Sequence, residues 1–172
     1  MIEKILYSII KRKQAVPYAE MADEAEKALL MEAKETIGAV FGRSVRIRQV
    51  DAGSCNACEW ECTALTNPVY DVQRFGIDFV ASPRHADILL VTGPVSVAMA
   101  EALKKTYTAT PAPKLVIACG DCARDGGVYR GSYAVTDGVH NVLPVDGYIP
   151  GCPPTPSSLI RGIVDIVASR IR

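Results

Sequence analysis

Six cysteines are the residues of this 172-residue chain whose type and spacing are best suited to chemistry. Cys55 and Cys58 form one CxxC pair, and Cys119 and Cys122 form a second. Two thiolates at this spacing can bind one metal centre, because a tight turn places both sulfurs on the same side. Cys152 is followed by proline, an arrangement that recurs at iron–sulfur ligands. Since four thiolates are enough to hold a 4Fe–4S cluster, the pattern predicts a metal or redox centre.

The alternative for each cysteine is a small buried hydrophobic side chain, a common role for free cysteine. We favour that interpretation for Cys62, which lies in the helical stretch EWECTAL. For Cys119, at the end of an apolar strand, burial and ligation are equally open. Burial is a poor account of the other four, because four unrelated core cysteines would not all fall in turn-rich loops at strand ends.

Three other chemistries compete with an iron–sulfur cluster. A structural zinc site built from both CxxC pairs is a real competitor, but it leaves Cys152 without a role. A thioredoxin-like dithiol at Cys55 and Cys58 leaves the other cysteines spare. Radical-SAM chemistry uses three clustered cysteines, but the order CxxCxxxC is not the usual one and the chain is short for that barrel.

The elements that must position these cysteines alternate between strand and helix. Helical patterns cover 95–107 and 157–171, and the apolar runs typical of strands lie at 44–50, 79–80, 88–92, 114–118 and 142–145. This alternation predicts an α/β fold with a mostly parallel sheet and helices on both faces. Loops that follow parallel strands gather at one edge of the sheet, so cysteines distant in sequence can meet there.

The first forty-odd residues have a different pattern. Residues 1–13 place apolar side chains on one helical face and end in three basic residues, and residues 19–38 predict a second helix with an acidic face. Neither segment contains Cys or His. We therefore predict an N-terminal helical extension over 1–43 that docks on a partner, followed by a metal-binding domain over 44–172.

Charge and composition exclude several classes of protein. The chain has 19 basic and 19 acidic residues, so it lacks the basic footprint of a nucleic-acid binder. Apolar residues make up 49%, which with no net charge argues against disorder. No stretch is long and apolar enough to span a bilayer, and no secretory signal is visible. We expect a cytoplasmic chain, in which clustered cysteines indicate metal or redox chemistry rather than structural disulfides.

Five motifs carry a resemblance to a known family. They are DAGSCNACEWE, NPVYDVQRFGIDFV, SPRHADILLVTGPV, GDCARDGG and LPVDGYIPGCPPTP. In this order, over about 45–171, they resemble the small, electron-transferring subunit of membrane-bound energy-converting NiFe hydrogenases, of the formate hydrogenlyase type. The homologous subunit of respiratory complex I is a more distant relative.

The resemblance implies a flavodoxin-like fold that holds one 4Fe–4S cluster close to the active site of a large subunit. Carried over by motif, the cluster ligands are Cys55, Cys58, Cys122 and Cys152, and Cys119 falls where relatives often carry a non-ligand. The CxxC at the first position favours hydrogenase, because complex I relatives carry two adjacent cysteines there. The C-terminal extension that holds further clusters in soluble hydrogenases is absent, so we expect one cluster.

The resemblance also implies a function. The chain would be a non-catalytic electron-relay subunit of an oxidoreductase, between a ferredoxin-like polyferredoxin subunit and the NiFe site of a large subunit. Integral membrane subunits would hold the complex at the cytoplasmic face of the cell membrane, with this chain peripheral. The alternatives are a complex I-like subunit delivering electrons to quinone and a zinc-binding structural protein.

Four further residues are candidates around the centre. Glu59 could relay protons, as a nearby glutamate does in related hydrogenases, or act as an ordinary acid in the first turn of a helix. Arg74, Arg84 and His85 lie in the family motifs and could donate hydrogen bonds to cluster sulfurs or to the large subunit, raising the reduction potential. A plain salt bridge is an equal alternative for Arg74. For Glu61 and His140 we favour ordinary helix-start and surface roles.

Overall fold

Five parallel strands form one sheet in the computed structural model, which describes residues 23–169. The strands stand in the order β2-β1-β3-β4-β5, and every neighbouring pair is parallel. Their bounds are β1 Val45–Asp51, β2 Ile77–Phe79, β3 Ile88–Thr92, β4 Leu115–Cys119 and β5 Gly147–Ile149. This strand order is that of flavodoxin, so the predicted α/β, flavodoxin-like fold is confirmed.

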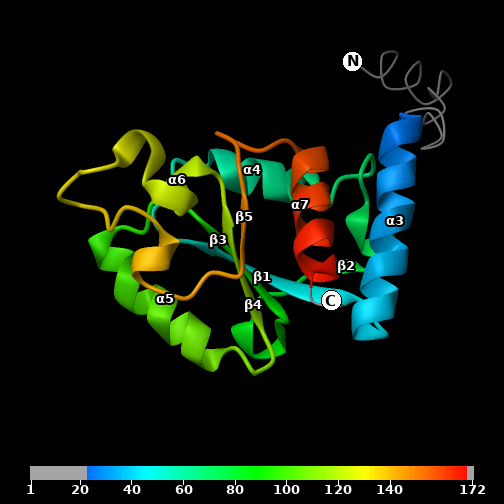
Figure 1. The fold of residues 1–172 in the computed structure, drawn as a ribbon, viewed down its shortest axis with the longest axis horizontal. Helices are drawn as coiled ribbons and strands as arrows, with labels where there is room; N and C mark the ends of the chain where they lie inside the picture. Colours follow the sequence, from blue (N-terminus) through cyan, green and yellow to red (C-terminus); the bar gives the residue numbers. More distant parts are fainter. Residues whose placement is uncertain (1–22, 170–172) are drawn as a thin grey trace, which may run out of the picture.

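Helices cover both faces of the sheet (Figure 1). The α-helices are α3 Glu24–Phe41, α4 Ala57–Ala64, α5 Val97–Ala109, α6 Asp121–Asp125 and α7 Pro156–Ala168. Short 3-10 turns are η1 Val72–Phe75, η2 Pro83–His85, η3 Gly127–Tyr129 and η4 Val139–Asn141. One buried cluster joins α3, α4 and α7 to one face of the sheet, and a second joins α5, α6 and the segment around Leu143 to the other.

The central strands are buried on both faces. All five residues of β3 (ILLVT) and of β4 (LVIAC) are buried, as expected of parallel strands between two helical layers. Successive side chains point to opposite faces. Ile117 and Cys119 therefore belong to the layer of α3, α4 and α7, and Val116 and Ala118 belong to the layer of α5 and α6.

Helix α3 packs along α7 (Figure 1). Its buried residues Leu29, Leu30, Ala33 and Ile37 share a core with Leu159 and Ile163 of α7, and Arg161 pairs with Glu32 at 2.6 Å. The helix predicted over 19–38 thus runs over Glu24–Phe41 in the described part, whereas the helix predicted over 1–13 lies outside the described residues. The division at residue 43 and the docking role of residues 1–43 stay predictions.

One predicted strand is displaced. Residues 142–145 are not a strand, and β5 begins at Gly147. Val142, Leu143 and Val145 instead pack as a loop against the layer of α5, so their apolar character comes from burial rather than from pairing in the sheet.

Within residues 23–169, no helix combines the length and apolar content needed to cross a membrane.

Candidate metal centre

Three loops that carry cysteines follow the carboxyl ends of three strands. Cys55 and Cys58 follow β1, Cys122 follows β4, and Cys152 follows β5. In Figure 1, α4, α6 and the beginning of α7, which adjoin these loops, lie along the upper edge of the sheet. The parallel topology thus brings together cysteines that are up to 97 residues apart in the chain.

The first loop is held by the end of β1. The Asp51 carboxylate accepts hydrogen bonds from the backbone N–H groups of Gly53 and Ser54, at 2.8 and 2.9 Å. Asn56 then adopts a left-handed conformation with φ 70° and leads into α4 at Ala57. This turn leaves Cys55 exposed in the loop and places Cys58, half-buried, in the first turn of the helix.

The second and third loops are joined by backbone hydrogen bonds. The N–H of Gly120 donates to the carbonyl of Ile149 at 2.8 Å, and the N–H of Asp121 donates to the carbonyl of Gly151 at 2.9 Å. In return, the N–H of Gly151 donates to the Asp121 carboxylate at 3.2 Å. These bonds fix the loop of Cys122 against the loop of Cys152.

Two glycines make room for the cysteine sulfurs. A β-carbon on Gly120 would lie 2.7 Å from the Sγ of Cys58, and one on Gly127 would lie 3.0 Å from the Sγ of Cys122. Gly120 also has φ +87°, a conformation that residues with a side chain rarely adopt. The sulfurs of Cys58 and Cys122 therefore lie directly against the backbone, in cradles that another side chain would fill.

The four cysteines also interact electrostatically. Burial raises the pKa of the Cys122 thiol above its usual value, and the charges of Cys152, Cys55 and Cys58 raise it further, against a lowering by the N–H of Val128. Neighbouring thiolates disfavour one another unless a cation neutralises them. Soft thiolate donors suit zinc or iron–sulfur centres. The four cysteines, with the space that Gly120 and Gly127 leave for their sulfurs, therefore fit a zinc ion or an iron–sulfur cluster. Within residues 23–169, no group of three or more His, Cys, Asp or Glu side chains is arranged around a single-ion position.

Cys119 and Cys62 lie behind this edge, in the core. Both are buried, with exposed fractions of 0% and 2%. Hydrogen bonds to Cys58 and Cys62, together with burial, raise the pKa of the Cys119 thiol, while the bond from Cys119 lowers the pKa of Cys58. A zinc site made from both CxxC pairs would need Cys119 as a ligand, and its side chain is directed into the core.

Glu59 is buried directly behind Cys58. Its side chain is 9% exposed, and one carboxylate oxygen accepts a hydrogen bond from the hydroxyl of Thr92 at the end of β3. The other carboxylate oxygen has no hydrogen-bond partner among the described residues. Glu61, two residues on, is only half-buried. The hydrogen bond between Thr92 and Glu59 could not be predicted from the sequence, because these residues are 33 positions apart.

The three basic candidates are not brought to the cysteine edge. Arg74 lies near Gly42 and Ser44, just before β1 begins, and its guanidinium donates to Asp71 at 2.9 and 2.6 Å. Arg84 and His85 are exposed in η2, three residues before β3 begins. The length of β1 or β3 separates these residues from the cysteine loops, so their position does not support hydrogen bonds to cluster sulfurs. Arg74 forms the salt bridge that was its alternative, and contact of these residues with a partner stays a prediction.

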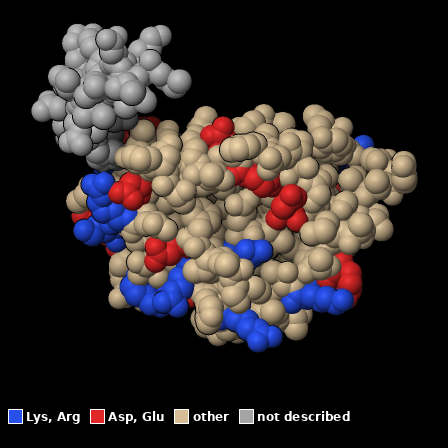
Figure 2. All heavy atoms as spheres, turned by 180° about the vertical axis from the view of Figure 1, so that it is seen from behind, with Lys and Arg blue, Asp and Glu red and all other residues tan. Residues whose placement is uncertain are grey.

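Exposed apolar side chains surround the cysteine loops, and sequence reasoning missed them. We call this set the apolar rim: Trp60, Val97, Val128, Tyr129 and Tyr133, which are 68%, 60%, 78%, 40% and 98% exposed. Trp60 lies in α4 after β1, Val97 begins α5 after β3, and Val128, Tyr129 and Tyr133 lie in and just after η3, in the segment that follows β4 and α6. Figure 2 shows that, on the face seen there, the Lys and Arg side chains lie mostly in the lower half, away from this edge. The available signal was the presence of large apolar residues close in sequence to the predicted cysteine loops.

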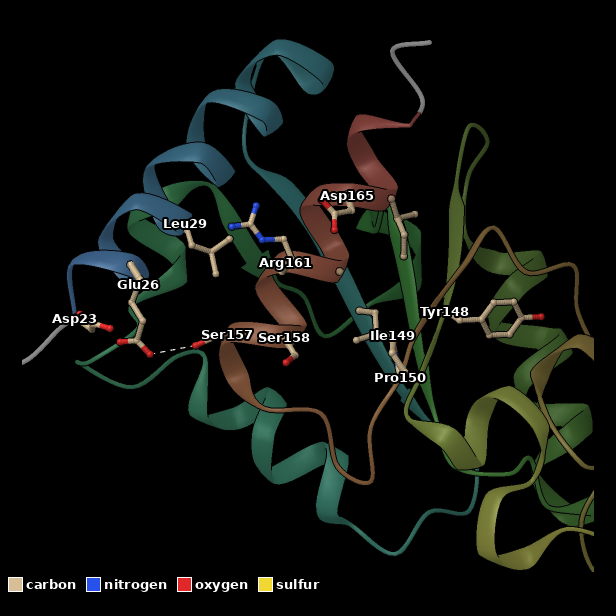
Figure 3. Close-up of a pocket in the computed structure, with 13 residues that line it drawn as sticks. Asp23, Glu26, Leu29, Tyr148, Ile149, Pro150, Ser157, Ser158, Arg161 and Asp165 are labelled. Carbon is tan, nitrogen blue, oxygen red and sulfur yellow. Dashed lines mark hydrogen bonds between the residues drawn. The ribbon is translucent and has the colours of Figure 1, made fainter.

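A separate groove of about 700 Å³ lies between α3, β5 and α7. In Figure 3, Glu26 reaches across it to a hydrogen bond from Ser157, with Arg161 and Asp165 further along α7. Tyr148 of the edge strand β5 lines its other side. None of the described cysteines lines this groove, so it is distinct from the candidate metal centre.

Comparisons with known proteins identify relatives of this chain. Residues 55–166 match the family described as NADH ubiquinone oxidoreductase, 20 Kd subunit. The chain is 42% identical over 144 residues to the probable membrane-bound hydrogenase subunit mbhJ of Pyrococcus furiosus, covering 84% of this chain and 86% of that one. It is 47% identical over 120 residues to formate hydrogenlyase subunit 7 of Escherichia coli, covering 70% of this chain and 47% of that protein.

A solved structure shares the fold as well. A chain of the membrane-bound sulfane sulfur reductase, an archaeal respiratory membrane complex, aligns with a TM-score of 0.64 and 31% sequence identity. The alignment covers 80% of this chain and 77% of that one. The fold is therefore also found in a chain of a respiratory membrane complex whose name does not mention hydrogenase.

Proposed function

This chain belongs to the family of the 20 kDa subunit of NADH ubiquinone oxidoreductase, and from that membership we propose that it is the electron-transfer subunit of a membrane-associated NiFe hydrogenase complex. Cys55, Cys58, Cys122 and Cys152 would hold one 4Fe–4S cluster. The observation that carries the proposal is that these four cysteines lie at one edge of the sheet. There the charges of the other three raise the pKa of the Cys122 thiol.

The residues of this chain supply both the ligands of the proposed binding site and the space around them. Four thiolates bind the cluster, and Gly120 and Gly127 leave room for the sulfurs of Cys58 and Cys122. The buried side chains of Glu59 and Cys62 lie behind Cys58 on α4. When bound, a 4Fe–4S cluster supplies one-electron transfer. The chain thus holds and tunes a redox group and has no catalytic centre of its own.

The partners follow from the exposed surface and from the relatives. The apolar rim would be covered by the large subunit that carries the NiFe site, because exposed apolar patches mark protein–protein contacts. Electrons would come from, or go to, a ferredoxin-like polyferredoxin subunit. Integral membrane subunits would hold the assembly at the cytoplasmic face of the membrane. Two relatives are named as subunits of a membrane-bound hydrogenase and of formate hydrogenlyase, which supports this assignment.

A second candidate is a respiratory complex whose large subunit holds no nickel, of the kind that transfers electrons to quinone or another acceptor. The likeness to a chain of the sulfane sulfur reductase complex favours it. The two candidates share the cluster and the fold of this subunit. The presence or absence of nickel in the large subunit distinguishes them.

Metal analysis and EPR of the native complex, purified without oxygen, test the proposal. We expect about four irons per copy of this chain after the other clusters are subtracted, together with one nickel per large subunit. Iron without nickel would favour the second candidate. Zinc without iron would overturn the redox assignment, because the cysteines would then hold a structural ion.

A further inference from the structure

The groove between α3, β5 and α7 has an apolar floor. Leu29 of α3, Ile149 of β5 and Ile166 of α7 line it, and all three belong to or pack against the core cluster of this layer. Among the described residues, β5 pairs only with β4, so it is an edge strand of the sheet. Proteins commonly cover such an edge with a helix or a loop. The groove therefore offers apolar surface along an edge that a further helix would cover.

The sides of the groove are acidic. Asp23 and Glu26 line it at the beginning of α3, and Asp165 lines it further along α7 (Figure 3). The basic residue in its lining, Arg161, is paired with Glu32 at 2.6 Å. Acidic side chains beside an apolar floor suit an amphipathic segment that carries positive charge.

This chain contains such a segment. Residues 1–22 lie outside the described residues, and the sequence of 1–13 predicts a helix with an apolar face formed by Ile2, Ile5, Leu6, Ile9 and Ile10. The same thirteen residues carry four basic side chains and one acidic one. A helix of this length is marginal in water on its own, so it needs an apolar surface on which to pack.

The groove also lies within reach of this segment. Asp23, which lines the groove, directly follows residue 22. The lining of α7 extends from Ser157 to Ile166, about 14 Å along a helix, and the apolar face from Ile2 to Ile10 would extend about 12 Å. Residues 14–22 can span about 30 Å when extended. The connection is therefore long enough for the segment to fold back along the whole groove.

We propose that residues 1–13 form a helix that occupies the groove between α3, β5 and α7 of the same chain. Its apolar face packs on Leu29, Ile149 and Ile166, and its basic side chains lie beside the acidic sides. The helix thus covers the edge strand β5 and completes the helical layer of α3 and α7. None of the four candidate cluster ligands takes part, so this inference does not depend on the proposed function.

The test compares four forms of the isolated full chain: wild type, the double variant Ile5→Asp with Ile9→Asp, Asp165→Lys and Glu101→Lys. The double variant removes the apolar face, and Asp165→Lys reverses a charge at the groove. Glu101→Lys is the matched control, because it makes the same change of charge at an exposed position of α5, on the other face of the sheet.

Hydrogen–deuterium exchange, read by mass spectrometry, reports on the segment. We expect the amides of residues 2–10 to exchange at least tenfold more slowly in wild type and in Glu101→Lys than in the double variant. Asp165→Lys should lose at least threefold of this protection. If Asp165→Lys does not fold, Ala25→Arg replaces it, because Ala25 is an exposed residue in the lining of the groove.

Carboxyl labelling with a carbodiimide and glycine ethyl ester reports on the groove. Asp165 is exposed among the described residues, and the helix would cover it. We expect Asp165 to be labelled at least threefold faster in the double variant than in wild type. The labelling of Glu101 in the same samples should not change.

Four outcomes would overturn the inference. Equal exchange of residues 2–10 in wild type and in the double variant would show that the segment does not pack on the chain. Equal loss of protection in Asp165→Lys and Glu101→Lys would make the effect one of overall charge. Protection seen only in the native complex would assign the segment to a partner. Protection that disappears on dilution, together with a dimer mass, would place the segment in the groove of a second copy.

Discussion

The sulfur of Cys58 lies against the backbone of Gly120, where an added β-carbon would approach it to 2.7 Å. The two residues are 62 positions apart and belong to different loops, one after β1 and one after β4. The two CxxC motifs are not equivalent pairs. Both cysteines of the first motif lie at the loop edge, whereas Cys119 of the second is buried and the glycine after it lies against Cys58.

Gly120→Ala should therefore disrupt the candidate centre. The new methyl group would collide with Cys58 and would also force a side chain into φ +87°. We expect iron content to fall by more than half and stability to fall by about 2 to 4 kcal/mol, the range typical of overpacking with backbone strain. Iron analysis and urea unfolding measure both effects.

Gly131→Ala is the control for the cost of placing a side chain at positive φ. Gly131 has φ +75°, but no atom lies within 4 Å of the position of its β-carbon. We expect a loss of about 1 kcal/mol and normal iron content. Equal iron loss in both variants would show that the approach of Cys58 to Gly120 is not needed for metal binding.

Serine substitutions should separate ligands from buried thiols. We expect Cys55→Ser, Cys58→Ser, Cys122→Ser and Cys152→Ser each to reduce bound iron strongly, because an alkoxide is a poorer ligand for iron than a thiolate. Cys62→Ser and Cys119→Ser should retain about four irons per chain. Iron and sulfide analysis with EPR provides the measurement. Iron retained in Cys122→Ser but lost in Cys119→Ser would show that the ligand set is wrong.

Thr92→Val should destabilise the chain through Glu59. The substitution keeps the shape of the side chain but removes the hydroxyl that donates to the buried carboxylate. With both carboxylate oxygens then lacking a described partner, we expect a loss of about 2 to 3 kcal/mol. Chemical denaturation of the metal-free chain tests this. Thr92→Ser keeps the hydroxyl and should lose less than half as much; equal losses would mean that packing, rather than the hydrogen bond, is responsible.

Trp60→Lys should weaken assembly without unfolding the subunit. Trp60 is 68% exposed on the apolar rim, so the isolated chain should change in stability by less than about 0.5 kcal/mol. If the large subunit covers this rim, loss of a buried tryptophan should weaken association at least tenfold, as at interface hot spots. Co-purification and titration with the large subunit measure it.

Thr108→Lys is the matched control for the rim. Thr108 is exposed near the end of α5, outside both the rim and the extension over 1–43, so its substitution should leave assembly unchanged. The rim would lose its assigned role if Trp60→Lys assembled as well as Thr108→Lys, or if both variants failed to assemble.

Much of this architecture could be predicted from the sequence because its signals are local. The runs ILLVT and KLVIA have the continuous apolar character of strands buried on both faces. Alternating strands and helices require parallel pairing, and parallel pairing brings the loops after β1, β4 and β5 to one edge. The cysteines at that edge were therefore predictable, as was the family, from the motifs around them.

Other features depend on contacts between distant segments and were decided only by the tertiary structure. The hydrogen bond between Thr92 and Glu59 has no local signature, and neither does the position of Arg84 and His85 at the far end of β3. The sequence determined which residues could do chemistry and at which end of each strand they fall. The packing of α4 against the sheet decided which of them meet, because side-chain contacts depend on how elements are placed in three dimensions, and no spacing along the chain records that placement.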